Sequence, residues 1–99
     1  MLFSELADMY LADKREGRKA VRANTYEGYV GAVNNHLLPR WGKEEVETIG
    51  YEDVQSWVDS FPDGRGAEKA YKTLRQMIRW AITKRHVTMA DPTIGVEVP

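Results

Sequence analysis

Four stretches of this chain repeat apolar residues with the period of an α-helix, and this pattern limits the fold more than any other feature. In the first, about 3–14, the apolar residues follow an i, i+3, i+4, i+7 pattern that forms one stripe. The others span about 24–38, 51–61 and 67–85, and no stretch alternates as a half-buried strand would. With 99 residues, we predict one all-α domain, a compact bundle of four main helices, with room for a short extra turn or helix near the C-terminus.

Residues near the ends of these stretches predict where each helix begins and ends. Asn24 has the chemistry of an N-cap, and Glu27 follows three residues later, as in a capping box. Pro39 is expected to end the second helix, and Gly50 to cap the third. Residues 62–66, with the sequence PDGRG, are expected to form a turn before the fourth helix.

The net charge of −1 conceals an uneven distribution along the chain. Residues 14–22 hold five cations against one acid, and residues 65–86 hold seven against one. Residues 43–63 reverse this balance, with one cation against seven acids. Because the local field steers a polyanion more than the net charge does, the two basic stretches keep nucleic acid open as a partner. We expect 14–23 to form a basic connection between the first two helices, and 87–99 to form a tail.

The residues that commonly build active sites or metal sites are sparse. His36 and His86 lie far apart in the sequence, there is no cysteine, and no serine lies in a G-x-S-x-G setting. We therefore expect no metal, no cofactor and no self-contained active site. No apolar run approaches the roughly 20 residues that cross a membrane, and the N-terminus lacks a secretory pattern, so a cytoplasmic location is expected.

The second helix carries a face with almost no side chains. Gly28 and Gly31 lie within it, although each glycine costs about 1 kcal/mol relative to alanine in a helix. Thr25, Ala32 and Asn35 are expected on the same face, opposite the apolar stripe. The stripe consists of Tyr26, Val30, Val33 and Leu37. A bare face permits close approach of either a phosphate backbone or a partner helix, and these residues alone do not decide between the two.

On the fourth helix an apolar arc lies opposite a polar, mostly cationic face. The arc consists of Ala70, Leu74, Met77, Ile78 and Ala81. The polar face consists of Lys69, Lys72, Arg75, Gln76, Arg79 and Thr83. Neutralisation of phosphates by such a stripe releases counterions and drives DNA binding, although a basic helix face can equally be plain surface. Trp80 lies outside the apolar arc, where it would either face a partner or pack under a neighbouring loop.

The order and spacing of these elements resemble the core-binding, SAM-like N-terminal domain of phage integrases, the tyrosine recombinases. An H-x-x-P-x-x-G element is present as His36, Pro39 and Gly42, and a long basic helix precedes Asp91-Pro92 and a final Pro99. Two positions differ from the family pattern. Gly50 replaces a Thr or Ser cap, and Asp91 replaces an Asn.

The resemblance implies a function in site-specific DNA integration and recombination. Such a domain holds duplex DNA at the crossover site as half of a clamp, while a separate C-terminal catalytic domain of the same chain exchanges the strands, so residues 1–99 are not expected to be an enzyme by themselves. The expected partners are double-stranded DNA, that catalytic domain and other integrase protomers on the DNA. The expected DNA-binding residues are Arg22, Thr25, Gly28, Gly31, Asn35, Lys69, Lys72, Arg75, Gln76 and Arg79. The alternative is a protein-interaction module that docks a partner helix on the glycine face.

Overall fold

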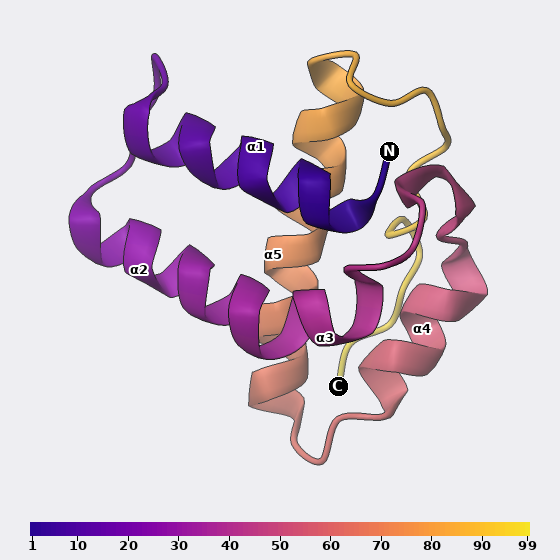
Figure 1. The fold of residues 1–99 in the computed structure, drawn as a ribbon. Coiled ribbons are helices and arrows are strands. Elements are labelled where there is room, and N and C mark those ends of the chain that lie inside the picture. The colour runs from indigo at the N-terminus through magenta and orange to yellow at the C-terminus, as the bar shows by residue number, and fades with distance from the viewer.

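A computed structural model describes all residues 1–99 and confirms the all-α bundle. The helices are α1 (Phe3–Glu16), α2 (Ala23–Ala32), a π-helical turn η1 (Val33–Leu37), α3 (Leu38–Trp41), a 3₁₀ turn η2 (Val46–Thr48), α4 (Tyr51–Asp59) and α5 (Gly64–Thr83). As Figure 1 shows, α1 and α2 run side by side, α5 crosses behind them, and α4 lies at the other end of the molecule. The only β-type pairing is an isolated bridge between Leu2 and Glu45.

The core forms where the predicted apolar stripes meet. In α1 the stripe buries Phe3, Leu6, Ala7 and Tyr10, as expected from its spacing. In α5 the predicted apolar arc is buried, together with Ala67, Tyr71 and Thr73. At the α3–α4 end, the Trp41 ring is fully buried and meets Trp57 edge to face, with ring centroids 5.6 Å apart. Edge-to-face packing suits the quadrupoles of two aromatic rings, so this pair closes one end of the bundle.

The second helix differs from its prediction at both ends. It begins at Ala23 with Arg22 as the N-cap residue, so the predicted Asn24 cap is wrong. The carboxamide oxygen of Asn24 instead accepts a hydrogen bond from the N–H of Thr25, at 2.9 Å. The cap thus lies two residues earlier than predicted, next to Val21, whose N–H donates to the carbonyl of Lys14 in the last turn of α1 at 2.9 Å.

Pro39 does not end the helix, contrary to the prediction. In a regular α-helix its ring would collide with the carbonyl group of Asn35. The π-helical turn η1 relieves this collision by widening the helix, with Leu38 N–H donating to the carbonyl of Val33 five residues earlier. The helical path therefore bends and continues through α3 to Trp41 (Figure 1).

The ends of α4 and α5 follow capping chemistry. Gly50 caps α4 as predicted, and its N–H donates to the Asp53 carboxylate at 3.0 Å. The predicted turn at 62–66 is only partly correct, because α5 already starts at Gly64. Asp63 is its N-cap and accepts a hydrogen bond from Gly66 N–H at 2.7 Å. This favourable cap extends the helix over two glycines that would otherwise disfavour it.

The segment 87–99 packs back on the bundle rather than leaving it freely. The Tyr71 hydroxyl donates to the carbonyl of Thr93 at 2.8 Å, and the Gln55 side chain exchanges two hydrogen bonds with the backbone of Glu97. The expected extra structure near the C-terminus is a turn over 92–95. These contacts fix the last residues against α4 and α5.

Asp91, one of the two residues that differ from the pattern of the resembled family, organises this segment. Its carboxylate accepts from Thr93 N–H at 2.9 Å, from the Thr93 hydroxyl at 2.6 Å and from Arg79 Nε at 3.1 Å. Burial raises the pKa of the Asp91 carboxyl, but the hydrogen bonds from Thr93 and Arg79 outweigh this effect and leave the pKa below its ordinary value. The position therefore favours a charged carboxylate.

We expect Asp91→Ala to lower the free energy of unfolding by about 2 kcal/mol, because it leaves a buried donor of Thr93 without a partner. Since the native pKa is depressed, the contribution of Asp91 is complete above the unfolded pKa near 4 and is lost as pH falls through the native pKa. Urea unfolding at pH 7 and pH 3 measures both effects. Asp91→Asn should lose less, because its amide oxygen still accepts from Thr93. Equal stability of Asp91→Ala and the unmodified chain at pH 7 would contradict this role.

Candidate nucleic-acid interface

The glycine face of α2 is open to solvent. A Cβ atom placed on Gly28 or on Gly31 would meet nothing within 4 Å outside its own helix. Thr25 and Asn35, predicted on the same face, are both exposed. No element of the chain packs against this surface, so the two glycines do not serve internal helix packing.

One predicted member of that face belongs to the core instead. Ala32 is 2 % exposed, and its placement on the bare face is therefore wrong. The π-helical turn begins directly after Ala32, and its wider winding shifts the later residues relative to a regular helix. Asn35 and His36 lie on this turn, with Asn35 exposed and His36 half-buried.

The cations of α5 are exposed except for the half-buried Arg75, and several have partners within the chain. Lys72 Nζ lies 2.8 Å from a carboxylate oxygen of Glu68, and this hydrogen bond is the main cause that lowers the pKa of Glu68. Arg79 binds Asp91, and the guanidinium of Arg75 lies 5.5 Å from the centroid of the Tyr71 ring. Lys69 makes no ion pair. Arg79 thus binds the C-terminal segment and Arg75 lies near Tyr71 of its own helix, neither of which the sequence pattern alone predicted.

Tyr10 of α1 contacts both α2 and α5. The Tyr10 ring of α1 lies 5.9 Å from the ring of Tyr29, the residue that follows Gly28. The Tyr10 hydroxyl also donates to the side-chain oxygen of Gln76 on α5, at 3.4 Å. Burial raises the pKa of Tyr10, so this hydroxyl stays protonated as a donor. The buried Tyr10 ring therefore packs between the Tyr29 side of α2 and Gln76 of α5, while the glycine face lies outside this contact.

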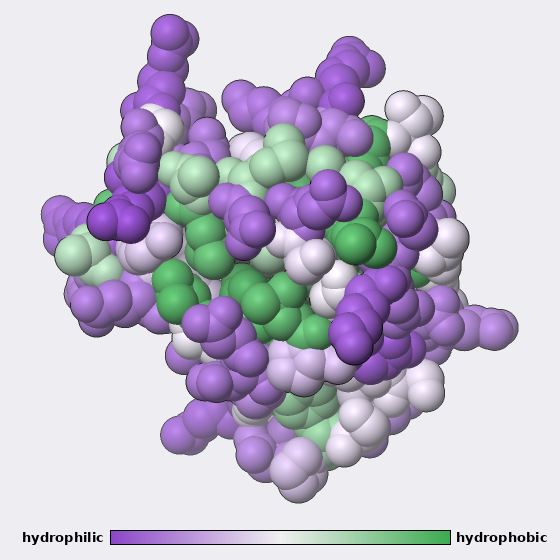
Figure 2. Space-filling model, viewed as in Figure 1, coloured by the Kyte–Doolittle hydropathy of each residue, from purple (hydrophilic) through white to green (hydrophobic).

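The acidic stretch 43–63 lies away from the connection between α1 and α2, and several of its carboxylates have partners within the chain. Glu45 and Glu47 bind the N-terminal amine of Met1, at 2.7 and 3.4 Å, and Glu44 pairs with Arg40. Figure 1 shows α4, which carries the rest of this stretch, at the opposite end of the molecule from the connection between α1 and α2. The seam between α1 and α2 that faces the viewer in Figure 2 is largely apolar and is bordered by hydrophilic side chains.

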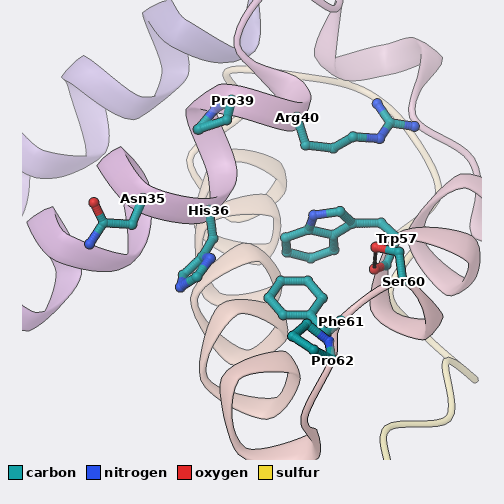
Figure 3. A pocket seen from close by; sticks show the side chains of 8 residues that line it. All are labelled: Asn35, His36, Pro39, Arg40, Trp57, Ser60, Phe61 and Pro62. Atoms are coloured by element: carbon teal, nitrogen blue, oxygen red, sulfur yellow. Dashed lines mark hydrogen bonds between the residues drawn. The ribbon is translucent and has the colours of Figure 1, made fainter.

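The H-x-x-P-x-x-G element lines a separate hollow of about 400 Å³ (Figure 3). Its lining residues are Asn35, His36, Pro39, Arg40, Trp57, Ser60, Phe61 and Pro62. The rings of His36 and Phe61 lie 5.4 Å apart, and Phe61 meets Trp57 at 5.3 Å. Gly42 closes the element, because a Cβ there would lie 2.7 Å from the Leu38 carbonyl oxygen. The element thus packs α3 against the end of α4.

Sequence reasoning left the position of Trp80 open between a partner-facing site and packing under a loop. The structure places its ring 5.5 Å from Tyr10 and 5.0 Å from His86, with the indole nitrogen buried and without a hydrogen-bond acceptor. The ring therefore packs within the chain. The π-helical turn was missed altogether, although a proline four residues after Asn35 was the available indication.

Comparison with known proteins agrees with this architecture. The family described as phage integrase, N-terminal SAM-like domain, matches residues 2–61. A solution NMR structure of a fragment, residues 61–160, from Clostridium leptum has a TM-score of 0.78 at 23 % identity and covers 99 % of this chain and 88 % of that one. The solution NMR structure of an integrase-like domain from Bacillus cereus has a TM-score of 0.79 at 20 % identity and covers 99 % and 83 %. Among curated protein sequences, none matches significantly.

The fold and its two outward helix faces define a small all-helical domain of the SAM-like type. The family match extends over more than half of the chain, and the chain belongs to the phage integrase N-terminal SAM-like domain family. None of its helices combines the length and the hydropathy that a membrane span requires.

Proposed function

We propose that this chain binds duplex DNA at the crossover site of a phage- or prophage-type site-specific integrase, as one half of a clamp. Strand exchange would belong to a separate C-terminal catalytic domain. The observation that carries the proposal is the open glycine face of α2, and the exposed lysines of α5, Lys69 and Lys72, support it. A domain that contributes half of a clamp is expected to bind duplex DNA weakly, at micromolar strength or worse.

The chemistry of the two faces supports this proposal. On α2, Thr25 and Asn35 offer neutral hydrogen-bonding groups beside a backbone that a phosphate can approach closely, as contacts that position a protein on DNA require. On α5, Lys69 is unpaired and Lys72 is held only by an exposed pair with Glu68. Exposed ion pairs are weak, so a DNA phosphate can replace Glu68 as the partner of Lys72.

The salt dependence of DNA binding tests the proposal. Titration of a short duplex between about 50 and 200 mM salt should give a negative log–log slope, because bound phosphates release counterions. The double variant Lys69→Ala/Lys72→Ala should flatten this slope by about 2, if each lysine meets one phosphate. We choose these two rather than Arg79, since loss of Arg79 would also disturb Asp91.

Lys43→Ala is the matched control, because Lys43 is an exposed lysine in the acidic stretch and should leave the slope unchanged. Binding that does not depend on salt, or an unchanged slope in the double variant, would refute the proposal. Failure to bind duplex DNA, together with chemical shift changes on α2 upon addition of a helical peptide, would favour the protein-interaction alternative.

A further inference from the structure

The fold brings the two basic stretches of the sequence together at one pocket. The end of α1, the following connection and the end of α5 enclose a hollow of about 270 Å³. Its lining residues are Asp13, Lys14, Arg18, Lys19, Trp80, Thr83 and Lys84. Four cations thus face one carboxylate across segments that lie more than 60 residues apart in the chain.

The charges in this pocket are incompletely paired. Lys14 Nζ lies 3.6 Å from the Asp13 carboxylate and 5.2 Å from the centroid of the Tyr10 ring. Arg18, Lys19 and Lys84 are exposed and make no ion pair. Lysines in the last turn or at the cap of a helix stabilise its carbonyl end, which accounts for Lys14 and Lys84. This effect does not explain the presence of Arg18 and Lys19, which lie beyond the end of α1.

Trp80 adds a second, independent observation. It lines the pocket, and its Nε1–H is buried without any acceptor in the chain. An unpaired buried donor costs free energy, and an anion that reached this nitrogen from the pocket would supply the missing acceptor. The pocket therefore combines surplus positive charge with an unused hydrogen-bond donor.

The pocket lies on the same helix as the exposed lysines of the proposed interface. Trp80 lies one turn after Gln76 on α5, and its ring contacts Tyr10, which also packs against Tyr29 of α2. The distance along α5 from Lys69 to Lys84 is about 22 Å at 1.5 Å per residue. This length corresponds to about six base pairs at 3.4 Å each. One duplex could thus meet both Lys69 of α5 and the pocket.

We propose that this pocket is a phosphate subsite that holds a backbone phosphate of duplex DNA, in addition to the contacts proposed above for α2 and α5. The inference rests on the proposed DNA-binding function and adds to it a contact made by Arg18, Lys19 and Lys84. Free inorganic phosphate shares the same chemistry, so the experiment must distinguish the two sources.

Nuclear magnetic resonance of the three tryptophan indole N–H groups provides the test, with the Trp80 signal assigned from Trp80→Phe. Addition of a short duplex should move the Trp80 indole signal in a saturable way and leave that of Trp41, which is fully buried, in place. The variant Lys19→Ala/Lys84→Ala should abolish this movement, weaken duplex binding roughly tenfold at low salt and flatten the salt slope by about 1. Lys43→Ala serves again as the control for loss of a lysine.

The outcomes separate this inference from the proposed function. One outcome would refute the subsite and leave the proposed function standing. Duplex DNA would shift the amide signals of α2 and α5 but not the Trp80 indole signal, and Lys19→Ala/Lys84→Ala would have the same salt slope as the unmodified chain. If inorganic phosphate moves the Trp80 signal and duplex DNA does not, the pocket binds free anions only and the inference is overturned. If no duplex binds at all, both proposals fall together.

Discussion

Gly31→Leu should weaken duplex binding at least tenfold while leaving the fold intact. A Cβ atom at position 31 would have no neighbour within 4 Å outside its own helix, so the substitution disturbs no internal contact. Leucine also favours a helix by nearly 1 kcal/mol over glycine, and the free energy of unfolding should stay the same or rise. Affinity should fall because the leucine side chain occupies the space that a phosphate backbone needs. Fluorescence anisotropy with a labelled duplex and urea unfolding measure the two effects on one variant.

Two control variants test whether the loss of affinity comes from the filled space at Gly31. Gly31→Ala should gain stability and lose less affinity, because a methyl group fills less of the gap. Ser56→Leu places the same side chain on the exposed surface of α4 and should leave DNA binding unchanged. Opposite changes in stability and affinity at Gly31 would be hard to explain by damage to the fold. If Gly31→Leu binds DNA as tightly as the unmodified chain, close approach to this face is wrong.

Apolar periodicity was sufficient to predict most of the fold. It gave α1, α4 and α5 to within about three residues at each end, because each of these helices must bury one continuous stripe. It failed at Pro39, where the outcome depends on whether the preceding turn can widen. It also failed at Gly64, because a helix-breaking pair of glycines competes there with the Asp63 cap. In both places two local effects of similar size oppose each other, and the pattern does not show which one prevails.

The candidate site was predictable only in part. Glycines on one helix face fit DNA and helix packing equally well, and only the empty space around Gly28 and Gly31 shows that the chain itself does not use them for packing. The pairing of Arg79 with Asp91 depends on the return of the C-terminal segment, which no helical pattern encodes. The pocket at Trp80 likewise requires the ends of α1 and α5 to meet. Contacts between segments far apart in the sequence were thus the part of the site that the sequence did not predict.

Trp41→Ala should cause the largest loss of stability, about 3–5 kcal/mol, as expected when a large buried aromatic side chain is truncated. Trp41 is fully buried, packs edge to face on Trp57, and lies 3.9 Å below the guanidinium of Arg40. A small domain is stable by only about 5–15 kcal/mol, so this change removes a large share of the total. Urea unfolding followed by circular dichroism measures it without relying on tryptophan fluorescence.

Trp41→Phe distinguishes packing from polar contacts, because the Trp41 indole nitrogen is buried without an acceptor. Phenylalanine keeps an aromatic ring against Trp57 and removes that unpaired donor, so it should cost much less than alanine. Ile94→Ala, at a side chain that is 67 % exposed, should change stability little. A loss below about 1 kcal/mol for Trp41→Ala would mean that Trp41 does not close the end of the bundle. Because Trp41 lies away from the open face of α2, the folded fraction of Trp41→Ala should bind duplex DNA with unchanged affinity, whereas Gly31→Leu should lose affinity without losing stability.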